Sequence, residues 1–286
     1  MKLVTWNIQW GRGADGRVDL DRIVAHARRL ADFDVLCLQE VSAGYPELAG
    51  CDGGDQFAGL ATRLAGHEPI EGIATDAPHP AGGRRRFGEM IFSRLPVGAV
   101  FRYLLPWPPD LGVMSMQRVA LEATVVTPSG PWRVTTTHLE YYSPKQRGAQ
   151  VEALRDLHRE AAAHARTARP GSASDGPFDR AVRGGPSILC GDFNFKPEAS
   201  ERARLVSRID DATASYRDAW ELMHPGEAHA PTVGVHDKEQ WPGPPFTWDY
   251  VFVSEELAAR VRRLEVDLES DASDHQPVLL EIDDAG

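Results

Sequence analysis

The stretch Ile188-Leu189-Cys190-Gly191-Asp192-Phe193-Asn194 is an apolar run that ends in a carboxylate and, two residues later, in an amide. Short apolar runs of this kind predict buried strands. Further runs of this kind are followed or preceded by single polar residues, which are Asn7, Glu40, His138, Asp249 and His275. Because α/β folds place their active sites where strand ends meet loops, these residues are candidate site residues.

Each of these positions taken alone has an ordinary explanation. An Asp or Asn after a strand is usually a turn former, and a single His there is usually a hydrogen-bonded structural residue. Six such positions in one chain, all acid, amide or imidazole, indicate a reactive site instead. Carboxylate and amide oxygens are the ligands that Mg²⁺ and Mn²⁺ prefer. The chain has no Cys/His cluster, which argues against zinc.

Strand-like and helix-like patterns alternate along the whole chain. Strands are expected over residues 3–8, 35–39, 89–92, 118–126, 133–138, 187–190, 250–253 and 277–282. Helices are expected over residues 20–30, 57–64, 143–165 and 198–206. This interleaving predicts sheets covered by helices. No Pro/Gly-rich linker divides the sequence, so we expect a single domain over residues 1–286.

Three segments rich in Gly, Pro or Ser are predicted to be surface loops, at residues 76–86, 168–185 and 224–245. Residues 166–185 follow a long predicted helix and precede a strong predicted strand. We therefore expect a mobile loop there.

Composition limits the class of protein. The 286 residues are 42% apolar, which allows a sizeable core, and carry a net charge of −11, which argues against binding nucleic acid through a broad basic surface. The three cysteines form no C-x-x-C pattern and are expected to be reduced thiols. Met1 leads directly into a strand-like run, and no apolar stretch approaches the ~20 residues that cross a bilayer. We expect a cytoplasmic enzyme with no membrane span and no obligate protein partner.

The motifs Thr5-Trp6-Asn7, Gly191-Asp192-Phe193-Asn194 and Ser273-Asp274-His275, in this order, resemble the endonuclease/exonuclease/phosphatase superfamily, the deoxyribonuclease I-like proteins. His138-Leu139-Glu140, followed by Ser143-Pro144 and Gln146-Arg147, is most similar to the tyrosyl-DNA phosphodiesterase 2 and bacterial phosphodiesterase branch. The resemblance implies a four-layer α/β sandwich, with two mixed sheets packed face to face and flanked by helices.

The resemblance also implies a role for each matching residue. Asn7 and Glu40 would hold a Mg²⁺ or Mn²⁺ ion, and Asp274 would bind a metal or its waters. Asp192 would activate or orient water, Asn194 would donate to a phosphoryl oxygen, and His138 would contact the phosphate. His275 would be the essential imidazole, with Asp249 accepting its other N–H. Whether Asp192 or the His275–Asp249 pair deprotonates water stays open.

Two segments depart from the family pattern. Thr247-Trp248-Asp249 stands where the family usually has Arg-Ile-Asp, so the contact beside Asp249 differs. Met116-Gln117-Arg118 stands where abasic-site endonucleases carry a tyrosine-bearing loop, which argues against that activity.

These patterns predict a metal-dependent phosphoesterase whose substrate is a phosphodiester, either a nucleic-acid end or a small molecule. Arg84 and Arg85, in a basic triplet, are candidates for binding an anionic group, and Tyr141 and Trp248 for packing against the substrate. Surface solvation and loop packing are the ordinary explanations of these four residues. A phosphomonoesterase acting on sugar or inositol phosphates and an inactive binding module of the same fold are the alternatives.

Overall fold

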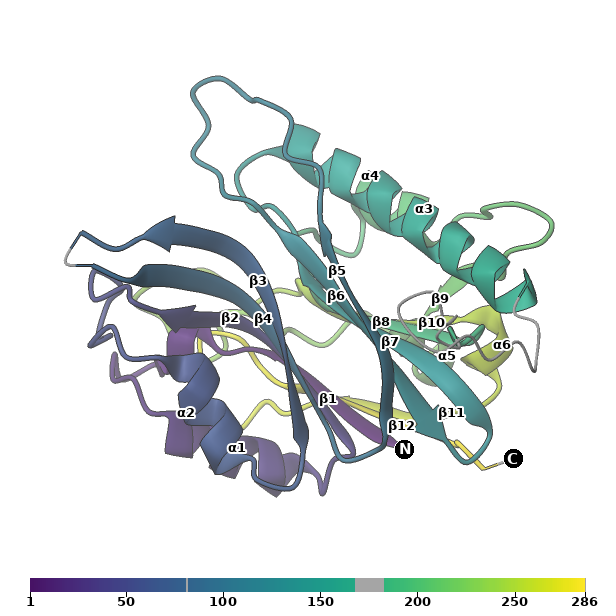
Figure 1. Ribbon diagram of the computed structural model, residues 1–286, viewed down its shortest axis with the longest axis horizontal. Helices are drawn as coiled ribbons and strands as arrows, with labels where there is room; N and C mark the ends of the chain where they lie inside the picture. The colour runs from purple at the N-terminus through teal and green to yellow at the C-terminus, as the bar shows by residue number, and fades with distance from the viewer. Residues whose placement is uncertain (81, 168–182, 286) are drawn as a thin grey trace.

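Two mixed six-stranded sheets lie face to face, with helices on the outer side of each (Figure 1). The computed structural model describes residues 1–80, 82–167 and 183–285. The first sheet has the order β11 (Val261–Val266), β12 (Val278–Ile282), β1 (Lys2–Asn7), β2 (Val35–Ala43), β4 (Arg84–Ser93), β3 (Glu68–Pro78). The second has the order β5 (Val97–Leu104), β6 (Val119–Thr127), β7 (Gly130–His138), β8 (Ser187–Asp192), β10 (Asp249–Ser254), β9 (Tyr216–Asp218). This is the predicted four-layer sandwich.

Amphipathic helices bury one face each against these sheets. Helices α1 (Leu20–Leu30) and α2 (Gln56–Arg63) cover the first sheet, and α3 (Pro144–Thr167) and α4 (Ser200–Val206) cover the second (Figure 1). Asp19 begins α1 by accepting a hydrogen bond from the backbone N–H of Arg22, which satisfies one of the free donors of the first turn. The short helices α5 (Ala219–Met223) and α6 (Glu255–Ala258) flank β9 and β10.

The space between the sheets is apolar except near the edge that carries the strand-end residues. Val134, Cys190 and Val251 of the second sheet belong to the same buried cluster as Leu3 and Cys37 of the first. Toward the edge, Gln39 crosses the gap, and its Nε2 donates to Thr5 Oγ1 (3.2 Å) and to Thr136 Oγ1 (2.8 Å). These buried hydrogen bonds fix one sheet relative to the other.

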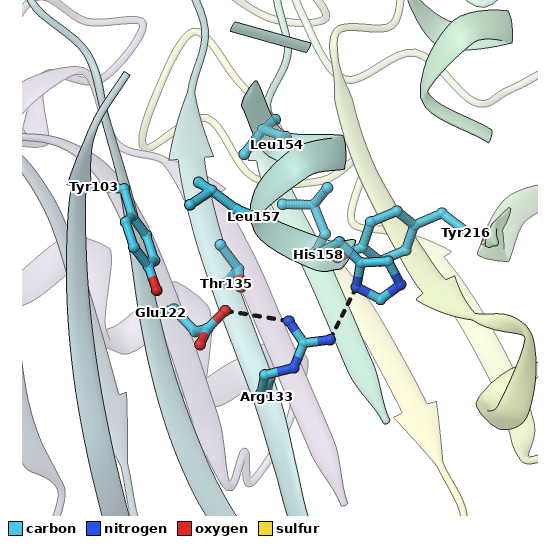
Figure 2. Close-up of a pocket in the computed structure, with 9 residues that line it drawn as sticks. Tyr103, Glu122, Arg133, Thr135, Leu154, Leu157, His158 and Tyr216 are labelled. Carbon is cyan, nitrogen blue, oxygen red and sulfur yellow. Dashed lines mark hydrogen bonds and ion pairs between the residues drawn. The ribbon is translucent and has the colours of Figure 1, made fainter. Parts of the chain in front are cut away.

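A buried polar cluster lies between the second sheet and α3 (Figure 2). Glu122 of β6 accepts from Arg133 of β7 (3.3 Å) and from Arg183 (2.9 Å). Arg133 Nη2 also donates to His158 Nδ1 of α3 (2.9 Å), so that nitrogen carries no proton, and His158 Nε2–H donates to the carbonyl of Ala214 (2.8 Å). Burial and the charge of Arg133 lower the pKa of His158 to about 4, which keeps the imidazole neutral at pH 7.

The predicted strands and helices are all present, with boundaries that shift by a few residues. The loop predicted at residues 76–86 is wrong, because β3 continues to Pro78 and β4 begins at Arg84, so most of that segment is a hairpin. In the loop predicted at 166–185, residues 166 and 167 belong to α3, and 168–182 lie outside the described residues. The single domain over 1–286 stays a prediction.

Two simpler predictions concern the thiols and the membrane. Cys37 and Cys190 are buried, and all three cysteines are free thiols. Across the three described ranges, no helix has both the length and the apolar character needed to cross a bilayer.

Candidate active site

Five strand ends and the bulge within β2 meet at one edge of the sandwich. β1 and β2 are parallel and carry Asn7 and Glu40 there, while the parallel strands β7 and β8 end at His138 and Asp192. β10 and β12 run antiparallel to these neighbours and therefore begin at the same edge. Asp249 is the first residue of β10, and residues 273–275 lie just before β12. In Figure 1 this edge lies at the far end of β1 from the N-terminus. We call it the strand-end site.

The backbone at this edge adopts unusual conformations. Glu40, Asn194 and Gln9 have φ values of 62°, 51° and 44°, in the left-handed region that side chains other than glycine rarely enter. Glu40 also lies at a β-bulge, where the register between β2 and β4 shifts. Bulges re-aim a side chain, and strained residues persist where the surrounding structure fixes them, often at functional sites.

Asn7 connects the two sheets across the site. Its Nδ2 donates to Glu40 Oε1 and to Asp192 Oδ2, both at 3.0 Å, and its Oδ1 accepts from the backbone N–H of Gln9 (3.0 Å). The amide therefore holds two carboxylates from different sheets in fixed positions.

His275 forms an acid–imidazole pair. Its Nδ1 donates to Asp249 Oδ2 (2.8 Å), and the same oxygen accepts from the hydroxyl of Thr232 (2.6 Å). Burial lowers the pKa of His275, but the carboxylates of Asp249, Asp274 and Asp192 outweigh it and hold that pKa well above 6.5. The imidazole is therefore cationic at neutral pH, with its free Nε2 3.7 Å from Asp192 Oδ2.

His138 is the opposite case, a neutral imidazole. Burial and then the positive charges of Arg118 and His275 lower its pKa well below 6.5. Asn194 Nδ2 donates to His138 Nε2 (3.0 Å), so that nitrogen is the acceptor and Nδ1 carries the proton. Nδ1 has no hydrogen-bond partner and lies 3.8 Å from Glu40 Oε1. The site thus holds one charged and one neutral histidine.

Asp192 lies between the two histidines. Its Oδ2 is 3.4 Å from His138 Nε2 and 3.7 Å from His275 Nε2. Burial raises the pKa of Asp192 to about 7, against the opposing charge of His275. A carboxylate that titrates near neutral pH, in contact with a cationic imidazole, is suited to accept and return a proton.

Asp274 is held by donors from the 3-10 turn after β1 and from the loop at 224–245. Gln9 Nε2 (3.1 Å) and Trp241 Nε1 (2.9 Å) both donate to its Oδ2. Its charge is a cause of the raised pKa of Glu40, second to burial. Glu40 and Asp274 therefore repel each other in a buried setting, and a cation between them would relieve that repulsion.

The donor set fits a hard divalent cation. Glu40 and Asp274 supply carboxylate oxygens, and the Glu40 side chain is 18% exposed, so an ion can reach it from solvent. Asp192, Asp249 and His275 also place three ligand-type atoms within 4.8 Å of one another. His275 is hydrogen-bonded to Asp249 and protonated, however, so it has no lone pair to offer an ion. Glu40 with Asp274 is the better pair of ligands.

The four predicted substrate-binding residues fall into two groups. Tyr141 and Trp248 are in edge-to-face contact, with ring centroids 5.3 Å apart, and Trp248 lies 6.3 Å from the ring of His275. Arg84 and Arg85 lie in β4, not in a loop as predicted. Arg84 pairs with Asp76 (2.7 Å) and Arg85 with Glu47 (3.5 Å), and no contact recorded for the described residues joins either to the strand-end site. Their role in binding stays a prediction.

Glu89, Thr232 and the hydrogen bond of Trp241 to Asp274 were not predicted from the sequence. Glu89 of β4 is buried, its Oε2 has no hydrogen-bond partner, and burial raises its pKa well above 4.5, with the charge of Glu40 adding to the effect. A glutamate within an otherwise apolar strand was the available signal. Thr232 and Trp241 lie in the loop at 224–245, where the sequence gives no sign of the contacts they make.

Comparison with known proteins is consistent with this geometry. Residues 4–275 match the Endonuclease/Exonuclease/phosphatase family. No functionally curated protein is similar enough in sequence to count as a match.

Solved structures of similar fold cover nearly the whole chain. An endonuclease/exonuclease/phosphatase from Beutenbergia cavernae is 26% identical with a TM-score of 0.71, covering 100% of this chain and 72% of its own. A mannosyl-6-phosphatase from Bacteroides thetaiotaomicron is 17% identical (TM-score 0.66), with 99% of both chains covered. A truncated TDP2 from Caenorhabditis elegans is 19% identical (TM-score 0.60), with 98% of this chain and 95% of that one covered. The chain belongs to the endonuclease/exonuclease/phosphatase family of phosphoester hydrolases.

Proposed function

We propose that this protein hydrolyses phosphodiesters with the help of a Mg²⁺ or Mn²⁺ ion. The observation that carries the proposal is the arrangement around Asp192, whose Oδ2 is held by Asn7 at 3.0 Å and faces His138 and His275 at 3.4 and 3.7 Å. A buried carboxylate between a neutral and a cationic imidazole, beside the acidic pair Glu40 and Asp274, is suited to water activation at phosphorus.

In the proposed reaction, Asp192 accepts a proton from a water molecule whose oxygen attacks phosphorus. The ester P–O bond opposite the incoming oxygen breaks, the leaving oxygen takes up a proton from solvent water, and Asp192 afterwards releases its proton to solvent. The cationic His275, held by Asp249, stabilises the negative charge that grows on the phosphoryl oxygens, and Asn194 fixes the orientation of the neutral His138 beside it. A divalent ion held by Glu40 and Asp274, with Asn7 fixing Glu40, would supply further positive charge when bound.

The first test measures hydrolysis of bis(p-nitrophenyl) phosphate and of p-nitrophenyl phosphate with Mg²⁺ or Mn²⁺. We expect Asp192→Asn and His275→Ala each to lower kcat/KM for the diester by about 10²- to 10⁴-fold, the size of a general acid–base contribution. Glu47→Gln, which removes an exposed carboxylate that pairs with Arg85, is the matched control. Full activity in both site variants would overturn the proposal, and a preference for the monoester would favour the phosphomonoesterase alternative.

The second test measures metal binding without turnover. Titration calorimetry with Mn²⁺ should show binding to the unmodified protein and at least about tenfold weaker binding to Glu40→Gln, because a neutral amide replaces a charged ligand. Equal affinity in the two proteins would remove Glu40 from the metal site. No binding in either would instead favour an inactive module of this fold.

A further inference from the structure

A continuous series of aromatic rings leads away from the catalytic imidazole. We call Tyr142, Tyr141, Trp248, Trp241 and Phe246 the aromatic strip. Ring centroids are 4.5 Å apart for Tyr141–Tyr142, 5.3 Å for Tyr141–Trp248, 5.3 Å for Trp241–Trp248 and 4.5 Å for Phe246–Trp248. Trp248 lies 6.3 Å from His275. The strip therefore begins at the strand-end site and continues to the surface.

The outer rings of the strip are open to solvent. Tyr141 is 38% exposed and Tyr142 is 51% exposed, whereas rings that serve only as core packing are buried. Trp241, Trp248 and Phe246 are half-buried. Exposed rings that connect through Trp248 to a catalytic residue offer flat apolar surface to a bound group.

The backbone that presents these rings is held in place before any ligand binds. Arg147 of α3 donates to the carbonyls of Glu140 and Tyr141, both at 3.1 Å, and the backbone N–H of Tyr142 donates to Glu140 Oε1 (2.9 Å). Thr232 accepts from the backbone N–H of Trp248 (3.1 Å). A preorganised surface of this kind loses little conformational entropy on binding.

The basic triplet of β4 offers no unpaired cation to a substrate with several negative charges. Arg84, Arg85 and Arg86 are all paired with carboxylates, at 2.7, 3.5 and 2.6 Å. The chain as a whole carries a net charge of −11. Recognition beyond the phosphate therefore relies on ring surfaces more than on cations, which disfavours polyphosphorylated sugars and long nucleic acids.

We propose that the aromatic strip is a substrate subsite for a flat, uncharged ring that is ester-linked to the phosphate and remains on it after cleavage. This inference rests on the proposed phosphodiesterase activity and specifies its substrate as a small phosphodiester with one aromatic ring. A nucleobase and a simple aryl group share this chemistry. Tyr141 is the specificity-determining residue, since it is the exposed ring in direct contact with Trp248.

The test compares two esters that break the same bond. Benzyl p-nitrophenyl phosphate and methyl p-nitrophenyl phosphate both release p-nitrophenolate and differ only in the group that stays on phosphorus. We expect kcat/KM to favour the benzyl ester by about tenfold, the size of one stacking contact. Tyr141→Ala should remove most of this preference, Tyr141→Phe should keep it, and Val126→Ala, an exposed apolar control on β6 (45% exposed), should leave both rates unchanged.

Equal kcat/KM for the two esters in the unmodified protein would overturn the subsite, as would a proportional loss for both esters in Tyr141→Ala. A cyclohexylmethyl ester that matches the benzyl ester would also overturn it, because the subsite would then be apolar without preferring a flat ring. Failure to hydrolyse any of these esters would instead refute the proposed function. The p-nitrophenyl ester of thymidine 5′-phosphate tests whether the subsite prefers a nucleobase or a simple aryl group. A higher rate than the benzyl ester indicates a nucleobase, and a lower rate indicates an aryl group.

Discussion

Acid should destabilise this protein through His158, the buried imidazole between α3 and the second sheet. Its Nδ1 accepts from the Arg133 guanidinium (2.9 Å), so a proton on that nitrogen would break the hydrogen bond and place two positive charges in contact. The pKa of His158 is about 4 in the folded protein, below its ordinary value of 6.5. Between pH 6.5 and pH 4 the unfolded chain therefore binds a proton at this imidazole, whereas the folded protein mostly does not. The free energy of unfolding decreases as the pH falls through this window. The loss from this one group between pH 7.5 and pH 4 is roughly 3 kcal/mol.

The measurement is the free energy of unfolding in urea, followed by tryptophan fluorescence, for the unmodified protein and His158→Gln. Glutamine cannot titrate, so the stability difference between the two proteins should shrink by roughly 3 kcal/mol between pH 7.5 and pH 4. His164→Gln is the matched control, because His164 lies on the same helix with its side chain 63% exposed. A difference between His158→Gln and the unmodified protein that does not change with pH would refute the reasoning.

Two other substitutions test buried charges at the strand-end site. Asp249→Asn removes the carboxylate that, after the opposing effect of burial, contributes most to the high pKa of His275. The pKa of His275 should therefore fall, so the alkaline limb of the pH profile of kcat/KM should move to lower pH, with a loss of about 10²-fold or more at pH 8. An unchanged alkaline limb would show that His275 does not act as a cation. Glu89→Gln removes a carboxyl group whose pKa burial raises well above 4.5, so above pH 4.5 the folded protein holds a proton there that the unfolded chain has released. Metal-free Glu89→Gln should gain stability over the unmodified protein above pH 4.5 by up to about 1.4 kcal/mol per pH unit. A difference in the free energy of unfolding between the two proteins that is the same at pH 5 and pH 8, measured in urea, would contradict this.

The interior of each sheet could be predicted from the sequence, and its edges could not. Every predicted strand lies inside a sheet, whereas the four unpredicted strands, β3, β5, β9 and β11, are the four edge strands. Edge strands have one partner and often carry charges, Gly or Pro that discourage further pairing, as Arg262, Arg263 and Glu265 show in β11. Their patterns therefore lack the continuous apolar run that marks a central strand.

The same distinction holds at the active site. Residues at the ends of central strands, such as Asn7 and Asp192, could be identified because a polar residue after an apolar run is visible in the sequence. Thr232 and Trp241 reach the site from a loop that folds back on it, and only tertiary contacts reveal them. The paired state of Arg84 and Arg85 is also invisible in sequence, because their partners Asp76 and Glu47 are brought near by the β3–β4 hairpin and a separate loop.

Because strands from both ends of the chain share one sheet, the loss of hydrolytic activity should follow the loss of the whole fold. The first sheet takes β1 to β4 from one end of the chain and β11 and β12 from the other, and the second sheet is built from everything between. Asn7 joins Glu40 from one sheet to Asp192 from the other, so any opening that separates the sheets also separates the reacting groups. Fragments cut between β4 and β5, or between β10 and β11, would each lack part of the reaction centre. We therefore expect activity and native fluorescence to disappear together during unfolding, with no inactive but folded intermediate between them.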